Sequence, residues 1–270
     1  MVEQLRIEYP QSVSKACRIL KMSRSVLHYK SIKDDNFFIT ALGSLAEKHP
    51  REGFWKSYGR LRNKGVVVNH KKLYRIYKSI GLAMRRKYKK RLPKREKRPL
   101  VIPSKFTQSW SIDFTSDVLE NGRKFRSFNV IDDYNREVLF IEVDYSLKSS
   151  RVVWVLNHLI GRYGKPQSIR MDNGPELIAG LMIHWSKANS ITFQYIEPGK
   201  PMQNGYIERF NRTYRENVLD SYIFESLEDV REITDEFVKD YNEERPHESL
   251  AGLSPVKYRE MEKQKLAVSI

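Results

Sequence analysis

The stretch Trp110-Ser-Ile-Asp-Phe-Thr115 reads as a buried β-strand with one acidic residue, Asp113, in its middle. Two more acids stand in equally distinctive surroundings: Asp172 in Arg170-Met-Asp-Asn-Gly-Pro-Glu176, and Glu208 in Gln203-Asn-Gly-Tyr-Ile-Glu-Arg-Phe-Asn-Arg-Thr213. Asp172 and Glu208 are separated by 35 residues. Two-metal phosphoryl transfer needs about three carboxylates that meet at one point. We therefore expect these three acids to form one site.

The residues around these motifs predict an α/β layer arrangement. Apolar and β-branched runs alternate with helical periodicity, and Asn121-Gly122 is typical of a hairpin turn between the first two strands. The expected order, β-β-β-α-β-α-β-α-α, describes a mixed sheet flanked by helices. The expected strands span 110–115, 124–132, 137–145, 167–171 and 192–196, and the expected helices span 149–164, 176–189, 206–217 and 227–241.

This order predicts where the three carboxylates lie. Asp113 falls on the first, central strand, and Asp172 follows a short neighbouring strand at its carboxyl end, where sites in open α/β sheets gather. Asn173-Gly174-Pro175 makes a turn that exposes Asp172. Glu208 projects from a helix on which Asn204, Arg212 and Arg215 share its face. The site would hold two Mg²⁺ ions, with Mn²⁺ able to substitute, and the carboxylates would repel one another without metal.

The composition indicates a polyanionic partner. The 270 residues contain 49 Lys and Arg against 33 Asp and Glu, a formal charge of +16 with a pI near 9.7. Nucleic acid and an anionic membrane surface both fit such a charge. No run of 18 apolar residues is found, so no segment is expected to span a bilayer, and no signal peptide is expected. Of the two kinds of partner we expect nucleic acid and no membrane. Cys17 is the single cysteine, which excludes an internal disulfide and a Cys-rich zinc finger and favours the cytoplasm.

The first 84 residues predict two helix-turn-helix-like units. The first spans 12–30, with Ser23 as a possible cap of its second helix and Arg24 on the polar side. In the second, a helix over 58–65 and a helix over 70–80 capped by Asn69 present Lys71, Lys72 and Arg75 outward, as a groove-contacting face would. The alternative for the first unit is a plain helical hairpin with a solvated basic face, and for the second unit it is a surface helix that happens to be basic.

A basic linker is expected between these units and the α/β region. Ten of the fourteen residues 85–98 are basic, a composition that predicts disorder without DNA and binding to phosphates that weakens with salt. The simpler interpretation is a solvated charge run. The candidate phosphate contacts in this linker are Arg85, Arg86, Lys87, Lys89 and Lys90.

The motifs resemble those of bacterial insertion-sequence transposases of the IS-three family and, more distantly, retroviral integrases. The resemblance is carried by Ser111–Thr115, Met171–Gly174, Pro201–Asn211 and the closing motif Asp240-Tyr-Asn-Glu-Glu-Arg-Pro-His247, and it covers roughly residues 10–260. It implies a ribonuclease-H-like core with a D,D(35)E triad at the three acids named above. It also implies that Arg215 is the basic residue near the donor strand.

The resemblance further implies an enzyme that cleaves and joins DNA at element ends. The partners would be double-stranded DNA (terminal inverted repeats and target), a second copy in a dimer or larger assembly on DNA, and the product of an upstream reading frame. The location would be the bacterial cytoplasm, at the nucleoid. A regulator that binds without cutting and a nuclease without strand transfer are the rival functions. Further DNA contacts are expected at Asn173, Asn204, Tyr206, Arg209 and Arg212.

Some residues keep two interpretations. Asp132 and Asp133 could approach the metal site, but turn capping is favoured. His247 could contact DNA or, with slight preference, have a structural role, and Tyr206 could stack on a base or be a half-buried aromatic. The expected domains are 1–34 and 35–84 (helix-turn-helix-like), 85–103 (basic linker), 104–260 (ribonuclease-H-like core) and 261–270 (polar tail).

Overall fold

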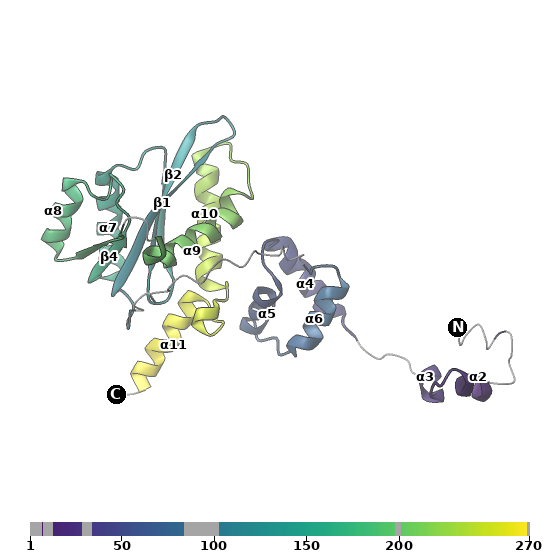
Figure 1. The fold of residues 1–270 in the computed structure, drawn as a ribbon. Coiled ribbons are helices and arrows are strands. Elements are labelled where there is room, and N and C mark those ends of the chain that lie inside the picture. The colour runs from purple at the N-terminus through teal and green to yellow at the C-terminus, as the bar shows by residue number, and fades with distance from the viewer. Residues whose placement is uncertain (1–6, 8–12, 29–33, 84–102, 198–200, 269–270) are drawn as a thin grey trace. The chain divides into compact units, whose positions relative to one another are not determined.

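The structure is a computed structural model that describes residues 7, 13–28, 34–83, 103–197 and 201–268 (Figure 1). The chain divides into two compact units, Met1–Ala41 and Leu42–Ile270. The expected basic linker 85–98 and its five candidate phosphate contacts lie outside the described residues.

The first unit contains two short helices, α2 (Val13–Ile19) and α3 (Arg24–His28). Lys21 has a φ of 51° at the turn between them, and Cys17 is buried. The predicted break at Met22-Ser23 therefore agrees with the structure, since α3 begins at the next residue. Binding of DNA by this pair remains a prediction.

Three helices follow: α4 (Asn36–Lys48), α5 (Phe54–Asn63) and α6 (His70–Ser79). Asn69 caps α6 as predicted, because its side-chain oxygen accepts a hydrogen bond from the backbone N–H of Lys71. However, α5 begins four residues before the expected start at Tyr58. Its first turn is held by Phe54, which is buried and makes edge-to-face contacts with Tyr74 and Tyr77 of α6.

The second unit is built on a five-stranded sheet with the order β3-β2-β1-β4-β5. β1 pairs antiparallel with β2, and β2 with β3, whereas β1 with β4 and β4 with β5 are parallel. This arrangement confirms the expected mixed sheet with the first strand at its centre. The strands are β1 (Ser109–Val118), β2 (Lys124–Asp132), β3 (Val138–Asp144), β4 (Ser168–Met171) and β5 (Thr192–Tyr195).

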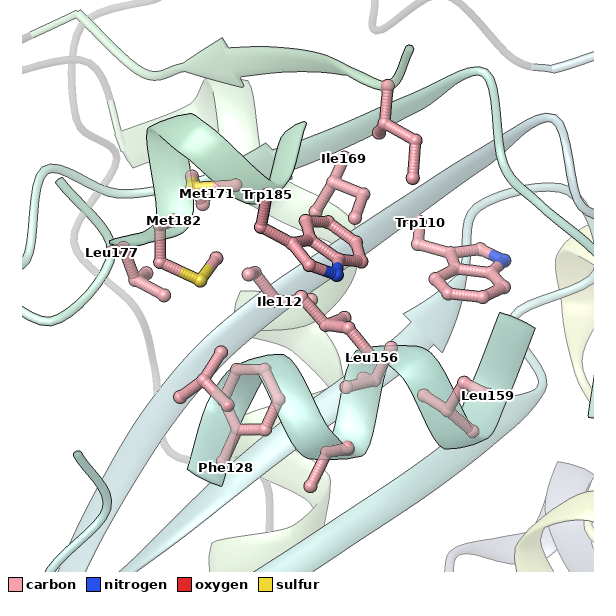
Figure 2. Close-up of a cluster of buried hydrophobic side chains, with 14 of the residues drawn as sticks. Trp110, Ile112, Phe128, Leu156, Leu159, Ile169, Met171, Leu177, Met182 and Trp185 are labelled. Atoms are coloured by element: carbon pink, nitrogen blue, oxygen red, sulfur yellow. The ribbon is translucent and has the colours of Figure 1, made fainter. Parts of the chain in front are cut away.

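Each face of the sheet has its own apolar core because side chains alternate along a strand. On one face Trp110, Ile112 and Phe128 pack under α7 (Ser149–Tyr163) and α8 (Gly180–Asn189), as Figure 2 shows for this cluster. On the other face the side chains of β2 and β3 pack against α9 (Gly205–Tyr214), the π-helical turn Arg215–Leu219 and α10 (Leu227–Glu243). The odd-numbered residues of β1, Asp113 among them, lie on this second face.

Two expectations about helices were wrong. A helix was expected from residue 176, but α8 begins at Gly180, and its buried apolar side chains are Met182 and Trp185. Leu181 is 49% exposed, so its apolar character does not mark the core side of this helix. The region expected to end in a polar tail is instead occupied by α11 (Pro255–Val268), which has almost no apolar face and therefore gave no periodic signal.

Short 3₁₀ turns at Pro201–Asn204 and Glu248–Leu250 complete the second unit. None of the described helices has both the length and the apolar composition needed to cross a bilayer.

Candidate active site

Asp113 lies in the middle of the central strand, on the face covered by α9. It is directly opposite Asn129 of β2 in the strand register. Its Oδ1 accepts a hydrogen bond from the backbone N–H of Phe114 at 2.8 Å, and its Oδ2 accepts one from Asn211 Nδ2 at 2.7 Å. Both oxygens are therefore held in place by the chain itself.

Asn211 is a site residue that the sequence reasoning missed. It lies on α9 one turn after Glu208, and its Oδ1 accepts a hydrogen bond from Asn129 Nδ2 at 2.8 Å. A chain of side-chain hydrogen bonds thus runs from β2 through α9 to Asp113. The available signal was the i, i+3 spacing from Glu208, which puts both side chains on neighbouring parts of one helix face.

Asp172 follows the last residue of β4, at the carboxyl end of the strand that pairs parallel with β1. Its Oδ1 accepts a hydrogen bond from the backbone N–H of Gly174 at 3.1 Å, so the carboxylate closes the turn that the sequence predicted. A Cβ at Gly174 would lie 3.1 Å from that same oxygen. A side chain at this position would therefore press on the Asp172 carboxylate.

Glu208 is exposed on the first turn of α9, while its neighbours Ile207 and Phe210 are fully buried. These apolar anchors fix the helix against the sheet, and the amphipathic pattern leaves the carboxylate outward. Partial burial raises the pKa of Glu208 above its ordinary value.

The three carboxylates interact electrostatically. Burial, followed by the charges of Asp172 and Glu208, raises the pKa of Asp113 to about 6, although the hydrogen bonds from Phe114 and Asn211 oppose this shift. No Lys or Arg among the described residues forms an ion pair with Asp113. Within the same part of the chain, no three acidic, His or Cys side chains are close enough together to hold an ion. The charges of Asp172 and Glu208 both act on Asp113, so both acids lie near it in the fold, and their role as a set of metal ligands remains a prediction.

Asp132 is the last residue of β2 and Asp133 follows it, and both are fully buried. The favoured turn-capping role fits Asp132, whereas the side chain of Asp133 is bound to residues of β1 and β4 and does not cap the turn. Asp132 accepts hydrogen bonds from the backbone N–H groups of Thr107 and Tyr134, and burial raises its pKa to about 7. Asp133 accepts hydrogen bonds from the hydroxyls of Ser109 and Ser111 and pairs with Arg170 at 3.2 Å. Their oxygens are occupied by these internal donors.

The residues expected on the face of Glu208 differ in environment. Asn204 is 2% exposed, with Nδ2 at 3.5 Å from the carbonyl oxygen of Ile112, so its side chain belongs to the interior and not to the predicted outer face. Arg212 is exposed and pairs with Glu216 at 2.8 Å. Arg215 donates to the carbonyl oxygen of Ser116 at 2.8 Å and pairs with Asp117.

The other candidate DNA contacts lie mostly at the surface. Asn173 is exposed, and its Nδ2 donates to the carbonyl oxygen of Ile196 at 2.9 Å, which joins the ends of β4 and β5. The remaining exposed candidates are Arg24, Lys71, Lys72, Arg75 and Arg209.

Tyr206 and His247 both have internal partners. The guanidinium of Arg136 lies 3.4 Å from the ring centroid of Tyr206, so one face of this half-buried ring is covered. His247 packs edge-to-face on Tyr241, and burial lowers its pKa well below the ordinary value. A neutral, packed imidazole fits the structural role that was preferred for His247.

Two family models, both described as integrase core domain, match residues 103–201 and 189–255. Over 249 residues the chain is 36% identical to the insertion element IS407 uncharacterized 31.7 kDa protein of Burkholderia multivorans, which covers 92% of this chain and 90% of that protein. It is 22% identical to the putative transposase InsK for insertion sequence element IS150 of Escherichia coli, over 96% of each chain. The catalytic core of the HTLV-2 integrase, solved in complex with magnesium, is 17% identical with a TM-score of 0.47 and covers 60% of this chain and 99% of that one.

The chain belongs to the insertion-sequence transposases with an integrase core. This membership agrees with the resemblance inferred from the three motifs, and it makes the mixed sheet with helices on both faces a ribonuclease-H-like core. Members of this family are polynucleotidyl transferases. The match to the integrase core begins at residue 103, which is close to the expected start of the core at residue 104.

Proposed function

We propose that this transposase cleaves DNA at the ends of an insertion sequence and transfers the freed 3′ hydroxyl to a target strand, with Asp113, Asp172 and Glu208 as its catalytic carboxylates. The observation that carries the proposal is the environment of Asp113. This carboxylate is partly buried at the centre of an integrase core, and its pKa is raised first by burial and then by the charges of Asp172 and Glu208, with no paired cation to lower it. A partly buried carboxylate beside two like charges is costly unless a cation compensates it.

The donor set supports a hard divalent cation. Three carboxylates offer oxygen ligands alone, which suits Mg²⁺ and also allows Mn²⁺. We propose two ions per site; when bound, such ions lower the pKa of the attacking hydroxyl or water and stabilise the charge on the leaving oxygen. Asn211 and the backbone N–H of Phe114 fix the Asp113 carboxylate so that it needs little reorganisation to receive a cation.

Cleavage and joining are the same substitution at phosphorus with different nucleophiles. In cleavage, a water oxygen forms the new P–O bond, and the element's 3′ oxygen leaves and takes up a proton. In joining, that 3′ oxygen attacks a phosphodiester of the target, gives up its proton and displaces a target 3′ oxygen. One site can therefore serve both steps.

We propose that duplex DNA is held by basic side chains on both units, including Arg24, Lys71, Arg209 and Arg215. Because two element ends have to be held together, we also propose a dimer or larger assembly on DNA. An upstream-frame product is a further proposed partner, and the nucleoid is the proposed place of action.

A supercoiled-plasmid assay with end-containing DNA and Mg²⁺ or Mn²⁺ tests the proposal. Joined products are expected; nicks alone would favour a nuclease without strand transfer, and a mobility shift without chemistry would favour a regulator. Glu208→Gln should abolish cleavage and joining while DNA binding persists. Glu216→Gln, which removes a half-exposed acid two turns further along the same helical segment, is the matched control and should keep activity. Wild-type activity in Glu208→Gln would refute the site.

A further inference from the structure

An exposed aromatic cluster lies on α5 and the beginning of α6, away from the three carboxylates in the sequence. Trp55 is 58% exposed and Tyr74 is 48% exposed. The ring centroid of Trp55 lies 5.9 Å from that of Tyr58 and 5.8 Å from that of His70. The ring centroids of Phe54 and Tyr74 are 4.9 Å apart. The rings therefore form one continuous surface and not scattered exposed side chains, and a contiguous exposed apolar patch marks an interaction site.

Two open grooves flank the Trp55 ring. The first, of about 520 Å³, is lined by Phe54, Trp55, His70, Lys71 and Tyr74, among others, and lies within α5 and α6. The second, of about 630 Å³, is bounded by Trp55, Tyr58 and Arg62 on one side and by the segment 246–253 on the other. Trp55 thus lines both grooves, and a ring exposed to this extent can offer a face on which a planar ligand stacks.

The charge of α5 and α6 indicates which kind of ligand the two grooves would bind. Neither α5 nor α6 contains an acidic residue, and together they carry six Lys and Arg besides Arg60, which is buried and paired with Glu52 and Asp240. The Arg62 guanidinium lies 5.8 Å from the ring centroid of Tyr58, so a cation stands beside the rings of the second groove. Lys71 is exposed at the first groove, and Glu248 is the acid that lines the second.

Aromatic faces bordered by cations are what unpaired nucleotides require, because bases stack on the rings and phosphates pair with the cations. In a duplex the bases are already stacked on one another and offer no free face to Trp55. We therefore propose that the grooves beside Trp55 bind unpaired nucleotides of DNA, such as those at a frayed or nicked end, with Trp55 as the stacking residue and Arg62 and Lys71 as phosphate contacts. This site takes its ligand class, DNA, from the proposed function, but it does not depend on the carboxylates.

The test uses the full chain carrying Glu208→Gln, without divalent metal, so that a failure of catalysis cannot affect the result. Fluorescence anisotropy would measure Kd for a labelled 15-nucleotide single strand, for the corresponding duplex, and for that duplex with a three-nucleotide 3′ overhang. Trp55→Ala should weaken binding of the single strand and the overhang by about 5- to 100-fold and of the duplex by less than about 2-fold. Trp55→Phe should recover most of the affinity for the single strand and the overhang that Trp55→Ala loses, because phenylalanine retains an aromatic face.

Trp154 supplies a matched control. It is similarly exposed on α7, with the Arg151 guanidinium 4.1 Å from its ring centroid, so Trp154→Ala removes a comparable indole at another place. This variant should bind all three probes like the parent. Equal losses in the two Trp variants, or an equal loss for single strand and duplex in Trp55→Ala, would overturn the proposal.

If Trp55→Ala fails to fold, crosslinking to the protein with Trp55 intact tests the same site. Photo-crosslinking from 5-iodouracil in the overhang should modify Trp55, Tyr58 or Tyr74, and modification confined to other segments would contradict the site. If Trp55→Ala instead abolishes self-association while oligonucleotide binding is unchanged, the surface is a protein interface and the proposal is wrong.

Discussion

Two acidic clusters in the second unit show opposite responses to burial. In the first, Asp113 has carboxylates as its charged neighbours, and its pKa rises to about 6. In the second, Glu52 and Asp240 share the buried Arg60, whose guanidinium donates to Glu52 at 2.8 Å and to Asp240 at 2.6 Å. Burial alone would raise the pKa of Glu52 and Asp240, but the hydrogen bonds and charge of Arg60 outweigh it, and both pKa values are lowered.

The difference separates a structural ion cluster from a site for an external cation. Arg60 joins α5 to α10, and Arg245 adds a second contact to Glu52 at 2.5 Å, so the charges of this cluster are neutralised within the fold. The cluster around Asp113 contains no paired cation among the described residues. Charge balance therefore favours the first cluster, and not the second, as the place of the proposed external cation.

Replacing a carboxylate in each cluster should have different consequences for catalysis. Asp113→Asn should reduce strand cleavage by about 10⁴-fold, equivalent to about 5 kcal/mol, because a ligand of the proposed ions is lost. Single-turnover cleavage of an end-containing duplex would measure this rate. Glu52→Gln, assayed under conditions where the variant remains folded, should keep a cleavage rate within about 10-fold of wild type. A loss of rate equal to that of Asp113→Asn would remove the distinction between the clusters.

Removing the cation of the structural cluster should mainly affect stability. Arg60→Ala leaves Glu52 and Asp240 buried without compensation, so the free energy of unfolding should fall by about 3–5 kcal/mol. Chemical denaturation would measure it. Lys64→Ala is the matched control from the adjacent position after α5, since Lys64 forms an exposed ion pair with Glu244 at 3.8 Å and should contribute less than about 1 kcal/mol. Equal losses in the free energy of unfolding for the two variants would show that the buried ion pairs of Arg60 contribute no more than the exposed ion pair of Lys64.

The pH dependence of stability should differ in sign between the clusters. Because the folded-state pKa of Asp113 lies above the ordinary 3.8, its ionisation lowers stability as pH rises from about 4 to about 6, and the cost persists above that range. Metal-free Asp113→Asn should therefore be more stable than wild type by about 3 kcal/mol at pH 7, with the difference vanishing near pH 4. For Glu52 and Asp240 the stabilisation is present at neutral pH and is lost as pH falls through their lowered pKa values. Urea titrations across pH 4–7 would test this, and a difference that grows toward acid pH would contradict it.

The smallest expected effect concerns a single DNA contact near the first cluster. Arg215→Ala should reduce the slope of log Kd against log salt by about one and leave thermal stability nearly unchanged. Lys239→Ala, which removes an exposed cation from α10, is the control and should not change the slope. An unchanged slope in Arg215→Ala would mean that the main role of Arg215 is to bind Asp117 and the carbonyl oxygen of Ser116 within the fold.

Much of the fold could be predicted from local patterns. Alternating apolar residues located β2 with its observed bounds, the Asn-Gly turn joined β1 to β2, and Asn69 marked the beginning of α6. These signals are short-range, since a strand, a turn or a cap depends on a few neighbouring residues. Local patterns failed where the first turn of α5 depends on contacts with α6, where the apolar Leu181 of α8 is exposed, and where α11 has no apolar face to give a periodic signal.

The sequence by itself determined the candidate carboxylates, because each stands in a motif that can be read without knowing its neighbours in space. Only the tertiary structure decided that Asn211 holds Asp113, that Asn204 is buried, and that Arg60 neutralises Glu52 and Asp240. Arg60 and Asp240 are 180 residues apart, and nothing in either local sequence encodes the pairing. Charge compensation depends on distances of a few ångströms, which are set by packing between elements and not by order along the chain.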